Sequence, residues 1–119
     1  MATFSKQLLS GSVTGTPISI GTGVTPTFIH QTSGSIDEVW LWGVNIHPTS
    51  ASSMITVVMG PSGSTPTTAS VMPLYGANGL TPILPGIPIT TTGSIPTRIS
   101  ATGQAGSSLN VVGFVNRIT

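Results

Sequence analysis

Four side chains in this 119-residue chain are candidates for acid–base chemistry or metal binding: His30, Asp37, Glu38 and His47. A serine hydrolase would combine Ser, His and Asp, but the sequence contains no Gly-x-Ser-x-Gly elbow. Asp37 and Glu38 are neighbours, so on a β-strand they point to opposite faces and cannot form a facing acid–base pair. The sequence therefore predicts no catalytic residues and no enzyme.

Metal, cofactor and nucleic-acid sites also lack the residues that they need. Two histidines without further ligands are weak evidence for zinc, and the chain has no cysteine. We expect His30, near the end of a strand, and His47, before Pro48, to be loop-edge residues bonded to backbone groups. The glycines lie in turns rather than before a helix, and three basic residues cannot follow a phosphate backbone. We expect no metal, no cofactor and no nucleic-acid partner.

The segment DEVWLWGVNI, residues Asp37–Ile46, holds both carboxylates and both tryptophans of the chain. If it is a strand, Trp40 and Trp42 share one face and lie about 7 Å apart. Most of both faces is apolar, whereas an antiparallel strand usually alternates apolar and polar side chains. The strand therefore needs a cover on its second face.

Two interpretations of the tryptophan pair remain open. The rings could stack sugars, with Glu38 and Gln31 as nearby polar partners, which would make the chain a carbohydrate-binding module. Alternatively, the rings pack in the core or at a subunit contact, where aromatic side chains dominate the energy of burial. We favour packing, and we predict that four residues divide between core and subunit contact: Trp40, Leu41, Trp42 and Val44.

Strand patterns recur along the chain between short clusters of Gly, Pro, Ser and Asn, while helix patterns are nearly absent. A single domain with this many short strands predicts an all-β fold, a two-sheet antiparallel β-sandwich of jelly-roll or immunoglobulin-like type. The predicted strands are Gln7–Val13, Pro17–Ile20, Thr27–Gln31, Ile36–Ile46, Met54–Met59, Ser70–Leu74, Ile83–Ile89, Thr97–Ala101 and Leu109–Ile118.

The connections have their own signals. Gly60–Pro66 combines proline and glycine and predicts an exposed chain reversal. Ala101–Ser108 is expected to join the last two strands as a hairpin. Thr81–Ile89 carries a proline at every third position, and each proline lacks a backbone N–H, so this segment is expected at a sheet edge. Residues 1–16 are expected to form an N-terminal arm, and residues 17–119 the sandwich domain.

Charge is the most unusual feature of the composition. Charged residues make up 4% of the chain, against about 25% in a typical protein, and the mean hydropathy is +0.40. Uncharged surfaces promote association, so we expect an assembly component whose surface is covered by partners. The apolar runs are too short for a membrane helix or a signal-peptide core. We therefore expect a protein made in the cytoplasm of its producer, with no membrane partner.

Two segments, IDEVWLWGVNI (Ile36–Ile46) and NVVGFVNRIT (Asn110–Thr119), resemble a group of small proteins that tailed phages encode beside the major capsid protein. The resemblance covers about 20 residues closely, and the family shows no equivalent of the proline-rich stretch. It implies a head decoration, or cement, protein: a β-rich homotrimer on the capsid surface of the virion that binds the major capsid protein and stabilises the assembled head. A tail or fibre-tip subunit is the alternative within the virion.

Overall fold

The computed structural model describes residues 3–21, 25–46, 52–76, 78–104 and 109–119. This part of the chain contains nine β-strands, and it holds no helix that is long and apolar enough to cross a membrane. The strands are β1 (Phe4–Leu8), β2 (Ile18–Ser19), β3 (Thr27–Gln31), β4 (Ile36–Asn45), β5 (Ser52–Pro61), β6 (Thr67–Tyr75), β7 (Thr81–Ile89), β8 (Thr97–Gly103) and β9 (Leu109–Ile118).

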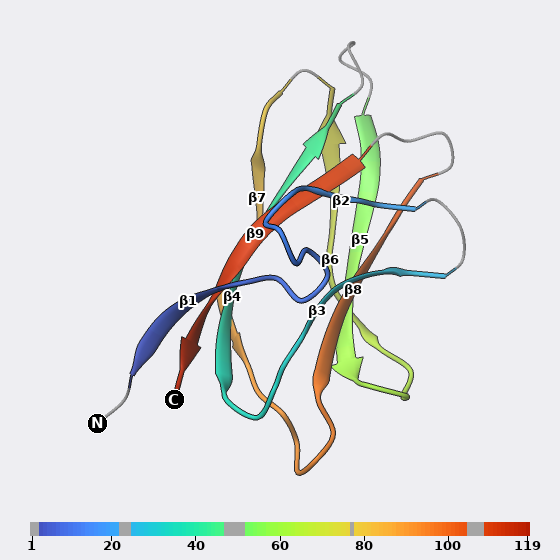
Figure 1. The fold of residues 1–119 in the computed structure, drawn as a ribbon. Helices are drawn as coiled ribbons and strands as arrows, with labels where there is room; N and C mark the ends of the chain where they lie inside the picture. Colours follow the sequence, from blue (N-terminus) through green and yellow to red (C-terminus); the bar gives the residue numbers. More distant parts are fainter. Residues whose placement is uncertain (1–2, 22–24, 47–51, 77, 105–108) are drawn as a thin grey trace.

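The strands form two antiparallel sheets that pack face to face (Figure 1). One sheet has the order β1-β9-β4-β7, with β2 also paired to β9, and the other has the order β3-β8-β5-β6. The pairs are nested: β5 with β6, β4 with β7, β3 with β8, and β1 and β2 with β9. If β1 and β2 are counted as one interrupted strand, this is the topology of an eight-stranded jelly roll.

The predicted β-sandwich is therefore confirmed, and of the two expected topologies the chain has the jelly roll. Every predicted strand overlaps one in the structure, but the first is misplaced, because Gln7–Val13 was predicted and β1 ends at Leu8. The prediction of a hairpin over Ala101–Ser108 is wrong, because β8 pairs with β3 and β5 whereas β9 belongs to the opposite sheet. Sequence spacing indicated a short connection, but it does not reveal that the connection passes from one sheet to the other.

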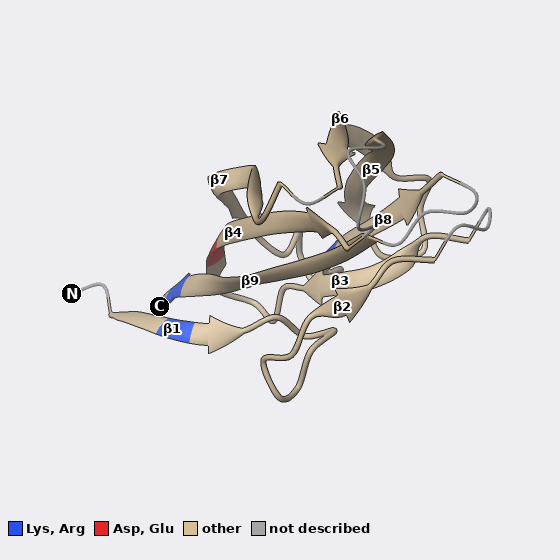
Figure 2. Ribbon diagram, turned by 90° about the horizontal axis from the view of Figure 1, so that it is seen from above, with Lys and Arg blue, Asp and Glu red and all other residues tan. Residues whose placement is uncertain are grey.

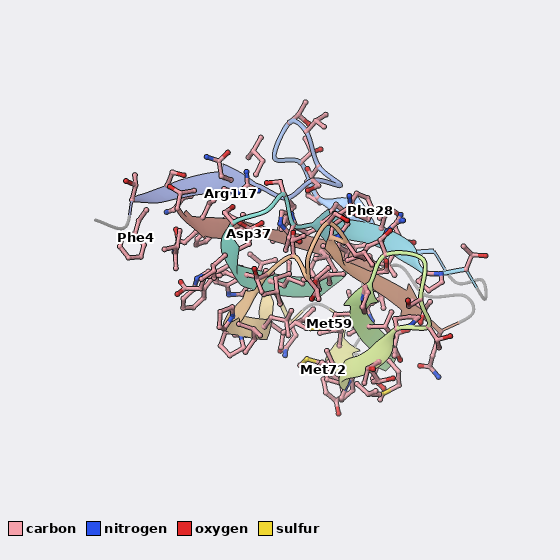
Figure 3. All side chains as sticks on the ribbon, turned by 90° about the horizontal axis from the view of Figure 1, so that it is seen from below. Phe4, Phe28, Asp37, Met59, Met72 and Arg117 are labelled. Atoms are coloured by element: carbon pink, nitrogen blue, oxygen red, sulfur yellow. The ribbon has the colours of Figure 1, made fainter. Side chains whose placement is uncertain are left out.

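The core fills the space between the sheets with side chains from alternate positions of each strand. In β4 the buried positions are Asp37, Val39, Leu41, Gly43 and Asn45, and the residues between them are half-buried on the other face. This period of two is the expected pattern for a strand with one face in a core. Met59 and Met72 pack against the core from β5 and β6 (Figure 3).

The N-terminal segment is part of the sheet over much of its length. β1 pairs with the C-terminal half of β9, and the segment between β1 and β2 then crosses toward β3. Leu9 enters the core there, and the N–H of Gly11 donates to the carbonyl of Ile29 on β3. Residues 9–11 thereby cover one open side of the sandwich. The role of residues 1–16 as an arm that reaches a neighbouring subunit stays a prediction.

The proline-rich segment forms β7 and lies at the edge of its sheet, as predicted, and within the described part of the chain it pairs only with β4. Its register shifts twice against β4. With these shifts Pro82, Pro85 and Pro88 lie opposite Trp42, Trp40 and Glu38.

Candidate functional site

The outer face of the β1-β9-β4-β7 sheet is the surface with the strongest chemical character. We call it the aromatic face. It comprises Phe4, Lys6 and Leu8 from β1; Asn110, Val112, Phe114, Asn116 and Ile118 from β9; Ile36, Glu38, Trp40, Trp42 and Val44 from β4; and Pro82, Pro85 and Pro88 from β7. Most of these side chains are apolar, although the face points away from the core.

Three aromatic rings occupy the centre of this face. The ring centroids of Trp40, Trp42 and Phe114 lie 6.0 to 6.3 Å from one another, with interplanar angles of 15° to 28°. The pattern arises because Trp40 and Trp42 alternate with buried residues on β4, and Phe114 is the cross-strand partner of Trp40 on β9. Near-parallel, offset ring pairs at such distances attract one another beyond the effect of burial alone.

The neighbouring strand β7 is shaped to receive one of these rings. Gly86 has φ +73°, a conformation that favours glycine, and it lies at a register shift against β4. A Cβ atom at this position would lie 2.7 Å from Cζ2 of Trp40. The absence of a side chain at Gly86 therefore lets the indole pack directly on the β7 backbone.

A single row of polar residues crosses the aromatic face. Lys6, Asn116 and Glu38 are successive cross-strand partners on β1, β9 and β4. Oε1 of Glu38 accepts hydrogen bonds from Nε1 of Trp40 at 2.8 Å and from Nδ2 of Asn116 at 3.1 Å. These two bonds hold the pKa of Glu38 below its usual range. Nζ of Lys6 lies 4.6 Å from the centroid of Phe114, a cation–π contact.

The bonds within this row have a consequence for binding. A polar group that loses water without gaining a partner opposes association. Here the indole N–H of Trp40 and the amide of Asn116 already have an acceptor within the face. Covering the centre of the face therefore leaves these donors satisfied, which is what an interface core needs.

Three large hydrophobic side chains of the aromatic face are strongly exposed. Phe4 is 69% exposed, Leu8 51% and Ile36 44%, whereas the three central rings are half-buried. Contiguous apolar surface of this kind, rimmed by polar residues, marks sites of interaction with proteins or ligands. The aromatic face is thus the candidate functional site.

The structure separates the four predicted interface residues. Leu41 is fully buried in the core, and Trp40, Trp42 and Val44 lie half-buried on the aromatic face. Their role in a subunit contact stays a prediction. Gln31 lies on β3 in the other sheet and does not accompany the tryptophans. The sequence reasoning missed Phe114 and Asn116, although alternation in the last strand already placed them together on one face.

Inside the sandwich, Asp37 is the centre of a buried polar cluster. Its Oδ1 lies 2.9 Å from Nε of Arg117, the cross-strand neighbour on β9, and its Oδ2 lies 3.2 Å from Nη2 of the same side chain. Nε2 of His30, from the opposite sheet, lies 2.7 Å from Oδ2. Figure 3 shows Asp37 and Arg117 close together beside the strands that carry them. The cluster therefore joins the two sheets through the core.

The covering segment adds a fourth member to this cluster. The backbone N–H of Ser10 donates to Nδ1 of His30 at 3.0 Å, and the Ser10 hydroxyl lies at the same distance from Nδ1. Because Nδ1 accepts the backbone N–H, the ring is neutral and Nε2 carries the proton that is donated to Asp37. Burial is the main cause of a lowered pKa at His30 and outweighs the opposing effect of Asp37.

Ser10, His30 and Asp37 are thus connected in the order used by serine hydrolases, but the geometry serves structure. The Nδ1 lone pair that a general base needs is engaged by the Ser10 N–H. The Ser10 hydroxyl is itself bonded to the carbonyl oxygen and the N–H of Gln31. His30 is completely buried, so a substrate has no access to the base.

One prediction about a single residue needs correction. His30 was expected at a loop edge, whereas it lies in β3 with no exposed surface and bonds to Asp37 as well as to a backbone N–H. Its apolar neighbours Phe28 and Ile29 gave no indication of the buried carboxylate across the sandwich. Of the arginines, Arg117 forms a salt bridge with Asp37, whereas the guanidinium of Arg98 lies over the ring of Phe28 at 4.4 Å. His47 lies outside the described residues.

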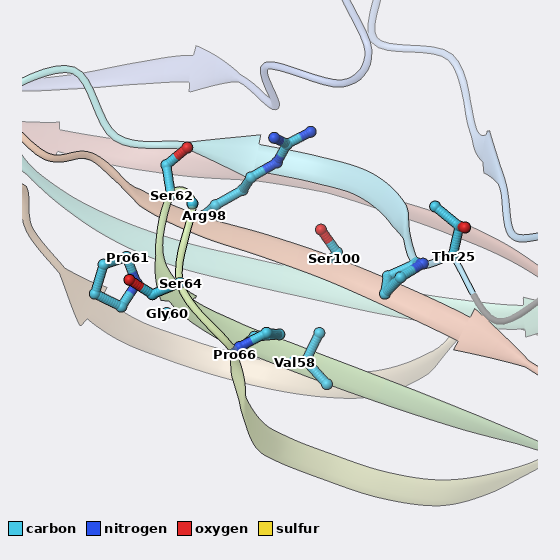
Figure 4. Close-up of a pocket in the computed structure, with 11 residues that line it drawn as sticks. Thr25, Val58, Gly60, Pro61, Ser62, Ser64, Pro66, Arg98 and Ser100 are labelled. Carbon is cyan, nitrogen blue, oxygen red and sulfur yellow. The ribbon is translucent and has the colours of Figure 1, made fainter.

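The outer face of the second sheet has a different character. It mixes hydroxyl side chains of β5 and β8 with scattered apolar side chains, among them Val58, Val71 and Tyr75. It also has a shallow hollow of about 270 Å³ beside the β5–β6 turn (Figure 4). Ser62, Ser64 and Ser100 line this hollow together with Arg98. The turn itself is the predicted reversal, with Gly63 at φ +84°. This face lacks the concentration of aromatic rings seen on the opposite side.

Four of the five charged residues lie close together, and the fifth, Arg98, lies on β8 in the other sheet. Lys6, Asp37, Glu38 and Arg117 lie near the chain termini, where Figure 2 shows the coloured segments of β1, β4 and β9 close together. Within the described ranges, no group of three His, Cys, Asp or Glu side chains could hold a metal ion.

A scan against protein-family models finds no match to the chain, and a search of curated proteins finds no significant match.

Proposed function

We propose that the chain is a structural protein of a phage virion that decorates the assembled head. In this proposal it is a homotrimer on the capsid surface, it binds the major capsid protein, and it is made in the host cytoplasm. The proposal assigns no catalytic step to any residue. It extends the resemblance of Ile36–Ile46 and Asn110–Thr119 to phage decoration proteins.

The observation that carries the proposal is the asymmetry between the two outer faces. One sheet presents the aromatic face with its three stacked rings. The outer face of the other sheet mixes hydroxyl groups and Arg98 with scattered apolar side chains such as Val71 and Tyr75. A monomer in water has no use for a broad apolar face, whereas a subunit that contacts neighbours on one side needs one. Jelly rolls occur in viral capsid proteins and in lectins, but fold alone does not establish function.

Stabilisation of a head by such a protein requires only selective binding. A subunit that binds the assembled shell, and not its dissociated parts, shifts the equilibrium toward the shell by mass action. Specific interfaces commonly bury about 1,600 Å² in total. In the proposed arrangement, Trp40, Trp42 and Phe114 form the centre of such a contact, and the polar row of Lys6, Asn116 and Glu38 fixes its orientation.

The test is a cryo-electron microscopy map of particles of the phage whose genome encodes the chain. Density for the sandwich at regular positions on the outside of the head, with the aromatic face turned toward neighbouring subunits, supports the proposal. Density on the tail or at a fibre tip favours the alternative virion role. Particles that lack the protein altogether overturn both roles.

A carbohydrate-binding module is the second candidate. It is favoured by the three near-parallel rings with Glu38 and Asn116 beside them, since sugar recognition combines aromatic surfaces with carboxylate and amide groups. Binding to a glycan array that disappears in Trp42→Ala, with an unchanged far-ultraviolet spectrum, would support this candidate. Binding that survives the substitution would remove the aromatic face as the sugar site.

A further inference from the structure

Three of the four sheet edges in this sandwich are obstructed to different degrees. β7 lacks backbone donors at Pro82, Pro85 and Pro88, whereas β6 lacks one at Pro73 and keeps its other donors. The edge of β3 is covered by the crossing segment, in which Gly11 bonds to Ile29 and Ser10 bonds to Gln31. Closing exposed edges in these ways prevents unwanted pairing with other chains.

The fourth edge, formed by β1, is open. Among the described residues β1 pairs only with β9, and all five of its residues are exposed. It contains no proline and no bulge in its register with β9. An edge of this kind presents a row of unpaired N–H and C=O groups to which an extended segment can add as a further strand.

The register identifies which backbone groups are available. Thr3 and Thr119 exchange both of their N–H···O=C bonds, at 2.8 and 2.9 Å. Because such pairs alternate along an antiparallel ladder, Ser5 and Gln7 also bond inward to β9. The N–H and C=O groups of Phe4, Lys6 and Leu8 therefore point outward, away from β9.

The side chains of these same three residues set the chemistry of a partner. Phe4, Lys6 and Leu8 share the aromatic face, and Phe4 and Leu8 are its most exposed apolar members. Lys6 is the only charged residue of the strand. A strand added beside β1 would place its own side chains directly opposite these three, where apolar pairs and opposite charges stabilise pairing.

A second copy of the chain cannot supply the matching charge. Its only carboxylate side chains are those of Asp37 and Glu38. Asp37 is buried against Arg117 and His30, and Glu38 lies on the central strand β4, bonded to Trp40 and Asn116. Pairing of β1 with its own copy would instead bring two lysines near each other.

We propose that the open edge of β1 binds an extended segment of a different protein, which presents an acidic residue opposite Lys6 and apolar residues opposite Phe4 and Leu8. The added strand prolongs the β1-β9-β4-β7 sheet and continues its aromatic face. This inference is independent of the proposed virion role, because it rests on the edge and its charge alone. It also locates a contact that the aromatic face does not provide.

The test uses the full-length protein labelled with ¹⁵N and two short capped peptides. Both alternate threonine with apolar valines on either side of a central residue, which is glutamate in one peptide and lysine in the other. We expect the glutamate peptide to slow amide hydrogen exchange at Phe4, Lys6 and Leu8, and to leave Ser5 and Gln7 little changed. One cross-strand charge pair predicts that the glutamate peptide binds about twofold to fivefold more tightly than the lysine peptide.

Three variants of Lys6 test the charge and the backbone donor separately. Lys6→Glu should invert the preference, so that the lysine peptide binds more tightly. Lys6→Pro removes the outward N–H as well as the charge and should weaken binding further than Lys6→Ala, which keeps the N–H. If Lys6→Pro fails to fold, the inversion in Lys6→Glu still decides the question.

Three outcomes overturn the inference. The first is equal binding of the two peptides or no preference change in Lys6→Glu. The second is protection that appears away from β1. The third is protection of the outward amides of Phe4, Lys6 and Leu8 in the free protein, which would mean that a second copy already occupies the edge.

Discussion

At the scale of single residues, Asp37 is the group on which the interior depends most. It is completely buried, and both of its oxygens accept bonds, from Arg117 on the same sheet and from His30 on the other. A buried carboxylate is tolerated only when it is paired and hydrogen-bonded. The cluster therefore fixes the relative position of the sheets at one end of the sandwich.

We predict that Asp37→Asn lowers the free energy of unfolding by about 3 kcal/mol, the lower part of the range for breaking a buried ion pair. The lower part applies because Arg117 remains 24% exposed and keeps access to water. Urea unfolding followed by tryptophan fluorescence measures the change. Glu38→Gln is the matched control on the outer side of the same strand and should leave the free energy of unfolding nearly unchanged, because glutamine keeps an Oε1 acceptor for Trp40 and Asn116. Equal losses in the two variants would contradict the structural role of Asp37.

The stability of the protein should fall on acidification below neutral pH. Burial lowers the pKa of His30, so the unfolded chain binds a proton at higher pH than the folded chain does. The contribution of His30 is therefore complete above its ordinary pKa of about 6.5 and is lost as the pH falls from there toward the folded-state value. Burial by itself would raise the pKa of Asp37, but bonds from Arg117 and His30 outweigh it and lower that pKa, so a second loss follows below about pH 4.

Unfolding free energies measured between about pH 7 and 5 test this dependence. His30→Gln should flatten the fall over that range, whatever its effect on absolute stability. His47→Gln replaces the other histidine of the chain and serves as the control that should keep the fall. A fall in stability that persists in His30→Gln and disappears in His47→Gln would show that His47, and not His30, causes the pH dependence.

The sequence could not have predicted this cluster. Asp37 and Arg117 lie 80 positions apart, and His30 approaches Asp37 from the opposite sheet. Their contact depends on the pairing of β4 with β9 and on the packing of the sheets, which local patterns do not determine. Part of the aromatic face could be predicted from the sequence, because alternation alone places Trp40 and Trp42 together.

At the scale of elements, patterning predicted the strands well and their connections less well. Gly, Pro and Ser clusters mark strand ends through their backbone preferences, which act locally. Whether a connection stays in one sheet or crosses to the other depends on which strands pair across the whole chain. The hairpin predicted between β8 and β9 was wrong because it depended on strand pairing. The edge position predicted for β7 was correct because each proline lacks the backbone N–H that a central strand needs.

The fit of β7 against Trp40 leads to a prediction about Gly86. Gly86→Ala adds a Cβ atom in a left-handed conformation and within 2.7 Å of the indole. We expect a loss of about 2 to 4 kcal/mol from backbone strain and overpacking together, with a shift in tryptophan fluorescence. Gly63→Ala has a similar φ but open space around the added atom, so it should cost less and leave the fluorescence unchanged. An equal effect of the two substitutions would exclude direct packing of Trp40 on β7.

At the scale of the whole molecule, we expect one outer face to keep the protein soluble and the other to associate with neighbouring subunits. The chain has few charges with which to repel its neighbours, and the hydroxyl-bearing face supplies polar surface in their place. The aromatic face has few polar groups of its own. Association through it should be driven by burial of apolar area, which salt screens very little, in contrast to association between opposite charges.

We therefore predict that light scattering behind a sizing column gives a mass near three times 12.0 kDa, and that this mass is the same at low and high salt. Val112→Lys places a charge on the aromatic face beside Trp42 and should yield a folded monomer. Thr102→Lys makes the same change on the outer face of the opposite sheet and should leave the trimer intact. If the unmodified protein is already a monomer, the aromatic face is free in solution, and either the capsid or a sugar must be what covers it. If instead Thr102→Lys dissociates the trimer and Val112→Lys does not, the subunits meet through the hydroxyl-bearing sheet.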